Sequence, residues 1–241
     1  MSSGAGCTVT APAADITLPA GGGSFPLSRL KLLRDLDVAD GELAQALAIL
    51  SACGVDNSPA LPLGIVDRLL LRAHHAVLGA DLELVVSCAA CGVLNELPLG
   101  PSDVPDYAPR SGWCGPGAGV REPTAVDLVD LPSDPATAGQ VLAGRCALGP
   151  AEAPRDSAAL DWAEQSLCGA VEFACIECDT RIAEFVDVQS LVTSAVAAAV
   201  AEVDIEVHLL ASQYGWDLAS IEALPEARRR RLAALARSEA R

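Results

Sequence analysis

Two Cys-x-x-Cys motifs constrain the fold of this chain more than any other feature of its sequence. Cys88 and Cys91 enclose two alanines, Cys175 and Cys178 enclose an isoleucine and a glutamate, and strand-like residues flank both motifs. A structural Zn²⁺ site takes four ligands in a tetrahedron, and cysteine thiolates are among its preferred ligands. One such motif at a hairpin tip directs two thiolates at one point, and two facing tips supply four. We therefore predict one zinc-ribbon-like site with Cys88, Cys91, Cys175 and Cys178 as its ligands.

Two other observations bear on this interpretation. In thioredoxin-type redox motifs the first cysteine begins a helix, which lowers its pKa, whereas both motifs here lie between predicted strands. Residues 92–174 separate the motifs, far more than the roughly 15–20 residues of a compact zinc ribbon, so zinc binding requires residues 100–170 to be an insertion. Two reduced structural pairs, a site that has lost its metal, and a thiol oxidoreductase using Cys175 and Cys178 remain alternatives.

The periodicity of apolar residues predicts an α+β, mostly helical fold. Residues 82–99 and 171–188 are each expected to form a β-hairpin. A long C-terminal helix over 189–213 is predicted by one apolar stripe with spacings of four and three. The stripe consists of Val196, Val200, Val203, Val207, Leu210 and Tyr214. The expected architecture is thus a zinc-ribbon-like pair of β-hairpins with an inserted helical and loop segment and a long C-terminal helix.

The rest of the chain divides by composition and by helix-ending residues. Residues 1–27 are expected to be a flexible arm, and residues 28–241 one domain. Residues 98–123 are irregular, rich in proline and glycine, and either mobile or a contact arm, and short helical pieces follow over 124–148. The other expected helices are 28–53, interrupted at Asp40-Gly41; 62–78, ended by Gly79; 157–168; a short helix capped by Asp217; and a last helix opened by Pro225.

Charge and hydropathy limit the partners that we expect. The formal net charge is −16, which opposes binding to nucleic acid or to an anionic membrane through a general basic field. The apolar run 191–203 is too short and too rich in alanine to cross about 30 Å of hydrocarbon, and the first residues do not resemble a signal peptide. We expect a cytoplasmic protein without membrane or nucleic-acid partners, in a compartment where Cys-x-x-Cys pairs are more often metal or redox sites than disulfides.

The sequence has no recognisable active site. It lacks a glycine-rich phosphate loop, a nucleophile elbow and a local Ser/His/Asp set, so we expect neither an enzyme nor a small-molecule substrate. Histidines 74, 75 and 208 are expected to be surface or satisfied core residues. Cys7 lies in the arm, and Cys114 is the one remaining thiol with any prospect of reactivity, although no His or Asp lies near it in the sequence. The expected buried, small apolar side chains are Cys53, Cys146 and Cys168.

The C-terminal segment "EARRRRLAALARSEAR" (226–241) concentrates arginines on a predicted helix. Arg228–Arg231 cover a full turn, so some of them must face inward or toward a neighbour. One interpretation is a helix that docks on an acidic partner surface. The other is a solvated terminal helix whose cations are favoured near its C-terminus.

The order of these segments resembles the T-even-type phage baseplate protein family of contractile tails, which also occurs in extracellular contractile injection systems. The resemblance covers about residues 60–237 and is most specific in "SQYGWDLASIEALPEARRRRL"; "REPTAVDL" and "LAGRC" in the middle of the chain add to it. It implies a structural or assembly role in a baseplate, with other baseplate, hub or wedge proteins as partners and no catalytic residues. It also implies that Cys88, Cys91, Cys175 and Cys178 occupy zinc-ribbon-like positions, although no proline lies between the cysteines here.

Overall fold

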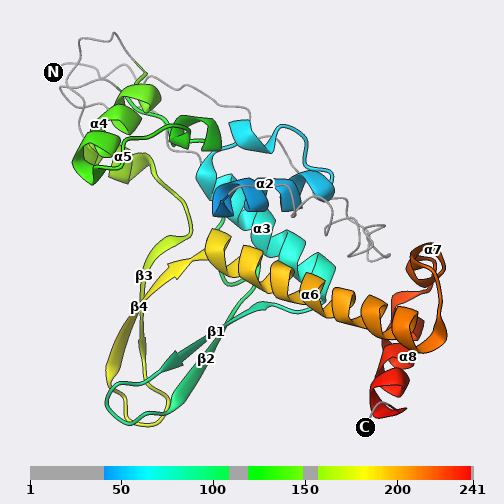
Figure 1. The fold of residues 1–241 in the computed structure, drawn as a ribbon. Coiled ribbons are helices and arrows are strands. Elements are labelled where there is room, and N and C mark those ends of the chain that lie inside the picture. Colours follow the sequence, from blue (N-terminus) through cyan, green and yellow to red (C-terminus); the bar gives the residue numbers. More distant parts are fainter. Residues whose placement is uncertain (1–40, 109–118, 149–156, 240–241) are drawn as a thin grey trace, which may run out of the picture.

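The computed structural model of this chain describes residues 41–108, 119–148 and 157–239, which form a helical body from which two β-hairpins extend (Figure 1). The fold is α+β, as predicted, and each hairpin is a separate two-stranded antiparallel sheet. The predicted arm, the helical segment before Asp40, and Cys7 and Cys114 lie outside the described residues.

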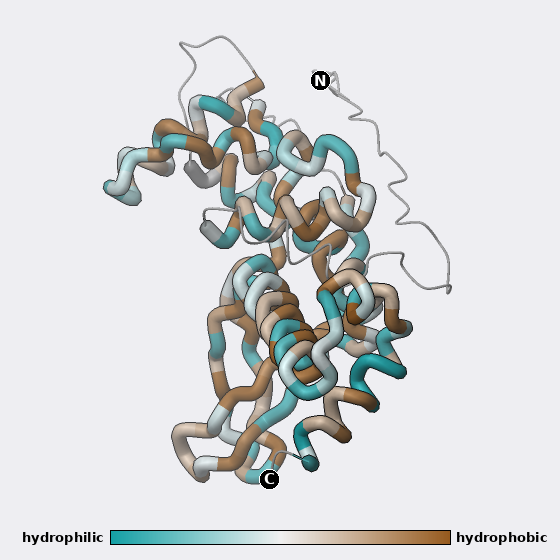
Figure 2. Tube along the Cα trace, turned by 45° about the vertical axis from the view of Figure 1, so that its right-hand side comes forward, coloured by the Kyte–Doolittle hydropathy of each residue, from teal (hydrophilic) through white to brown (hydrophobic). Residues whose placement is uncertain are grey.

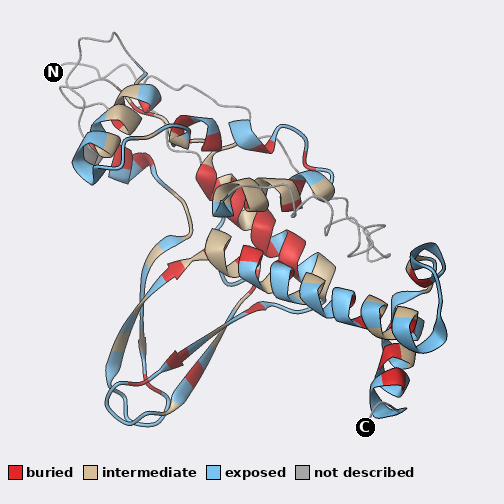
Figure 3. Cartoon of the chain, viewed as in Figure 1, coloured by how far each residue is buried: buried red, intermediate tan, exposed pale blue. Residues whose placement is uncertain are grey.

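Three helices build the main core: α2 (Glu42–Ala52), α3 (Leu63–Leu78) and α6 (Val188–Tyr214). Their apolar residues recur every three or four positions, so each helix turns one stripe toward the other two. Figure 3 shows buried residues concentrated where these helices meet, while the hairpins are mostly exposed. The fully buried side chains of this core include Ile49, Leu50, Val66, Leu70, Leu71, Val192 and Val196.

The long helix α6 follows its predicted bounds to within one residue at each end. The Asp187 side chain caps it by accepting hydrogen bonds from the backbone N–H groups of Gln189 and Ser190, and Gly215 ends it with a left-handed φ of 66°. Its length and composition alone would suit a membrane span. In the described fold, Val192 and Val196 of this helix are buried in the core that it forms with α2 and α3, and 28 % of its apolar stretch is buried.

The hairpins extend from the body on strands of six or seven residues. β1 (Leu82–Ser87) pairs with β2 (Leu94–Leu99), and β3 (Cys168–Ala174) pairs with β4 (Arg181–Asp187). At the hairpin bases, Leu82 and Val186 join the helical core. Further out, hydrophobic stretches run along strands that are largely exposed (Figures 2 and 3), so the core anchors only one end of each hairpin.

The predicted helix over 157–168 was too long. α5 covers Ser157–Ala163, and residues 164–167 connect it to β3 without regular secondary structure. Long-range hydrogen bonds hold this connection: the N–H of Gln165 donates to Glu122 Oε1, and the N–H of Leu167 donates to Asp67 Oδ2 at 2.6 Å. Cys168 therefore begins a strand and is exposed, so the prediction that it is buried was wrong.

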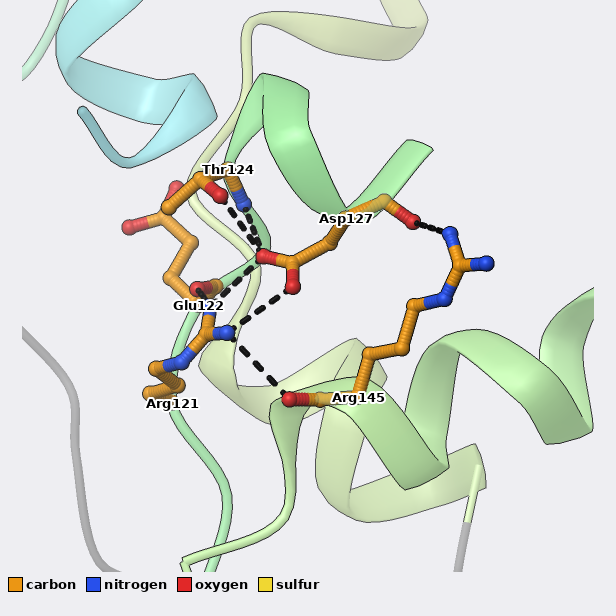
Figure 4. A network of polar contacts seen from close by, with 5 residues as sticks. All are labelled: Arg121, Glu122, Thr124, Asp127 and Arg145. Atoms are coloured by element: carbon orange, nitrogen blue, oxygen red, sulfur yellow. Dashed lines mark hydrogen bonds and ion pairs between the residues drawn. The ribbon is translucent and has the colours of Figure 1, made fainter. Parts of the chain in front are cut away.

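The insertion between the hairpins contains the short helical pieces that were predicted. They are η2 (Ala125–Leu128) and α4 (Pro135–Cys146). A further 3₁₀ turn, η1 (Ser58–Ala60), lies outside the insertion, between α2 and α3. Asp127 organises them (Figure 4): its carboxylate accepts hydrogen bonds from the Thr124 backbone and hydroxyl and from two nitrogens of Arg121. Burial acts to raise the pKa of Asp127, but these donors outweigh it and lower the pKa to about 2. The backbone oxygen of Asp127 accepts from Arg145, which ties η2 to α4.

The C-terminal part of the chain packs on the far end of α6. α7 (Leu218–Glu222) is capped by Asp217, as predicted, and α8 (Glu226–Glu239) follows. Arg229 is 4 % exposed, and its Nε donates to Glu206 Oε2 at 2.9 Å. At least one arginine of the cluster therefore faces inward, while Arg228 and Arg231 remain exposed.

Candidate metal centre

The four predicted cysteines meet at the tips of the two hairpins. Cys88 and Cys91 lie in the turn between β1 and β2, and Cys175 and Cys178 lie in the turn between β3 and β4. Their Sγ atoms all lie within 4.8 Å of one another, so the four thiols form one group able to hold a metal ion. Two turns that are 84 positions apart in sequence therefore share one site, at the end where the two hairpins converge (Figure 1).

The sulfur–sulfur distances fit a tetrahedral site. Cys88 Sγ lies 3.7 Å from Cys178 Sγ, and Cys91 Sγ lies 3.6 Å from Cys175 Sγ. A tetrahedron with metal–sulfur bonds of about 2.3 Å has edges of about 3.8 Å. A disulfide brings its sulfurs to about 2.05 Å, and all four cysteines are free. The spacing thus suits four ligands around one ion and does not suit two disulfides.

Both turns have the same backbone geometry, which explains how each aims two thiols at one point. The N–H of Cys88 donates to the carbonyl of Val93, and the N–H of Gly92 donates back to the carbonyl of Cys88. In the second turn, Cys175 makes the equivalent bonds with Thr180 and Asp179. The residue after each second cysteine is left-handed, with φ of 75° at Gly92 and 55° at Asp179. Glycine adopts this conformation freely and aspartate tolerates it, so the turn forms without a proline between the cysteines.

Asn95 joins the two hairpins beside the cysteines. It is 5 % exposed, and its Nδ2 donates to the carbonyls of Val86 and Val93 within its own hairpin. Its Oδ1 accepts the backbone N–H of Ile176 in the other turn at 2.9 Å. Sequence reasoning missed this role. The sequence does carry one signal for it. Asn95 is polar, although it shares a face of the strand with the apolar residues Val93 and Leu97.

Hydrogen bonds favour the thiolate form of the second motif. Backbone N–H groups of Glu177 and Cys178 lower the pKa of Cys175 to about 6, and the hydroxyl of Thr180, 3.2 Å from Cys178 Sγ, lowers the pKa of Cys178. The N–H of Val93 acts to lower the pKa of Cys91, but hydrogen bonds with the neighbouring thiols, that of Cys178 first, outweigh it and raise the pKa to about 12. A nearby thiolate resists a second negative charge, and a cation bound among the sulfurs would remove that penalty.

The cluster is accessible from one side. Cys88 and Cys175 are 2 % and 1 % exposed, whereas Cys91 and Cys178 are exposed. Buried ligands keep a metal in place, while exposed ligands give it a path of entry. The other cysteines do not join the group: Cys53 and Cys146 are buried, as predicted, and burial raises the pKa of each thiol to about 11.

The histidines do not belong to the cluster. His208 is exposed, and exposed His75 pairs with Asp81 through Nδ1 at 2.8 Å. His74 is buried, and its Nδ1 has no hydrogen-bond partner among the described residues. The prediction that the histidines are surface or satisfied core residues is therefore confirmed for two of them and wrong in part for His74. Burial lowers the pKa of His74, which favours its neutral form.

Comparisons with known proteins add no relative to this picture. No family model, no curated protein and no solved structure matches the chain.

Proposed function

We propose that Cys88, Cys91, Cys175 and Cys178 bind one structural Zn²⁺. Four thiolates form a soft donor set, and Zn²⁺ accepts a tetrahedron without preference from d-electrons. Four protein ligands leave no open position for a water or a substrate, which is typical of structural sites and not of catalytic ones. The observation that carries the proposal is the group of four sulfurs within 4.8 Å of one another.

Zinc would contribute most where the fold is weakest. A two-stranded hairpin is at best marginally stable alone, and these hairpins join the apolar core near their bases, through Leu82, Leu84, Leu99 and Val186. A structural zinc site supplies on the order of 10 kcal/mol of binding free energy, comparable with the net stability of a whole domain. The ion would therefore hold both hairpins together as one arm and close the insertion between them into a loop.

We further propose that this chain is a structural or assembly component of the baseplate of a contractile phage tail-like particle. Two arguments support the proposal. A closed, four-ligand site stabilises a surface and leaves no position for a reaction, and the sequence from about residue 60 to 237 resembles baseplate proteins. The chain would act through contacts with other baseplate, hub or wedge proteins, without substrate, nucleic acid or membrane, and would be made in the cytoplasm before joining the particle.

Capture of partners from the native host tests this role. A tagged chain should recover tail tube, sheath or wedge proteins, and a variant with Cys88→Ser and Cys175→Ser should recover less of them because its arm is not held together. Recovery of a regulatory protein unrelated to tails would instead favour a zinc-ribbon adaptor that acts outside a particle. Disulfide exchange at Cys175 and Cys178 in the purified protein would favour a thiol oxidoreductase.

A further inference from the structure

The outer surface of α8 carries an unpaired basic stripe. Arg228, Arg231 and Leu235 follow one another at spacings of three and four, so they lie along one side of the helix. The two arginines are exposed and make no ion pair within the described part of the chain, and Leu235 is 48 % exposed. Arg229, on the opposite side, anchors the helix to Glu206 at 2.9 Å. This basic stripe is therefore presented outward on a helix that is fixed from behind.

The outer face of the β1–β2 hairpin carries the opposite charge. Residues alternate between the two faces of a strand, and Val85 lies directly across from Glu96 in the strand register. Glu83 and Leu94 lie on the same face, on either side of that pair. Val85 and Leu94 are 51 % and 62 % exposed, and the two glutamates are exposed and make no ion pair with any described residue. This acidic face combines carboxylates with uncovered apolar side chains.

The two surfaces match in size and chemistry but lie apart within one chain. α8 has 14 residues and is about 21 Å long, and six-residue strands extend about 20 Å. β4 leads into the N-terminal end of α6, and the β1–β2 hairpin follows the C-terminal end of α3. α8 packs toward the C-terminal end of α6, and Figure 1 shows it apart from the hairpin tips. From Val188, where β4 leads into α6, to Glu206, where Arg229 binds, the helix extends about 27 Å.

We propose that the basic stripe of α8 in one copy of this chain packs on the acidic face of the β1–β2 hairpin in a second copy. Arginines meet glutamates, and Leu235 meets the apolar side chains Val85 and Leu94. The contact is head-to-tail, so a pair of copies keeps one free basic stripe and one free acidic face, and association continues beyond a dimer unless a ring closes. One helix on a two-stranded sheet buries little area, so each contact is weak and transient. The inference depends neither on the identity of the metal nor on a role in a tail.

Sedimentation velocity of the full-length, metal-loaded protein tests the proposal. Over roughly 10 µM to 1 mM protein, the range of dissociation constants of weak complexes, the mean mass should rise with concentration in 0.05 M salt. It should fall toward the monomer in 1 M salt, where the screening length shrinks to about 3 Å. R228E/R231E and E83K/E96K should each weaken association by at least about tenfold, because like charges then face each other.

Mixing the two variants provides the decisive result. R228E/R231E has two acidic surfaces and E83K/E96K has two basic ones, so neither associates with itself, yet an equimolar mixture restores opposite charges at every contact. Association should return in the mixture. R237E, on another side of α8, is the control and should associate as the wild type does. Circular dichroism and metal content should match the wild type in every variant. A wild type that stays monomeric throughout, or a mixture that fails to associate, would overturn the proposal.

Discussion

Removing a single thiolate should detach the two hairpin tips from each other while leaving the helical body folded. Cys175→Ser replaces a buried ligand whose sulfur lies 3.6 Å from that of Cys91. Three remaining thiolates hold Zn²⁺ much more weakly, and the hairpins then depend on Asn95 and on their bases, because the main core draws mostly on α2, α3 and α6. The metal supplies on the order of 10 kcal/mol, and losing even a third of that would raise the frequency of local opening by roughly 10²–10³-fold.

Hydrogen exchange measured segment by segment resolves this effect. Amide exchange should accelerate in β1, β2, β3 and β4 and stay unchanged in the buried turns of α3 and α6. Zinc content should fall from one ion per chain to none. The matched control is Cys168→Ser, an exposed thiol in the same hairpin outside the cluster, which should change neither readout. If Cys175→Ser kept both its zinc and the slow amide exchange of its strands, the proposal that the metal holds the two hairpins together would be refuted.

Three further predictions concern groups outside the metal ligands. Asn95→Ala removes the hydrogen bond to the Ile176 N–H and should lower zinc affinity about 10–100-fold in chelator competition, whereas the exposed neighbour change Glu96→Gln should not. Arg229→Ala leaves Glu206 buried without its closest partner and should cost about 3–5 kcal/mol in urea unfolding, against less than about 0.5 kcal/mol for Arg237→Ala; equal costs would contradict the burial argument. Burial raises the pKa of Asp67 from 3.8 to about 6, so the folded state binds the proton more tightly than the unfolded state. The stabilisation from protonated Asp67 is therefore fully present below pH 3.8 and is lost, by about 3 kcal/mol in total, as pH rises from 3.8 to about 6. Asp67→Asn should abolish that slope in thermal melts, and an unchanged slope would assign it to another group.

The turns and the long helix could be predicted from the sequence because residues close together in the chain determine them. The two Cys-x-x-Cys turns followed from strand-like flanks and a repeated spacing, and α6 followed from a stripe that continues through Val196, Val203 and Leu210. The end of α5 could not be predicted in this way, because distant carboxylates bind the backbone that follows it. Asp67 accepts from the N–H of Leu167, 100 positions away, and Glu122 accepts from the N–H of Gln165, 43 positions away. Asn95 was missed for the same reason, since its partner N–H lies 81 positions away. Long-range polar contacts leave little trace in the periodicity of one sequence.

The central claim is that four sulfurs from two distant turns surround one zinc ion. X-ray absorption at the zinc edge of the purified, unmodified protein measures both the element and its ligands. We expect one zinc per chain with four sulfur neighbours at about 2.3 Å and no nitrogen or oxygen in the coordination shell. A protein purified under reducing conditions that holds no zinc, or a zinc ion with mixed ligands, would contradict the account.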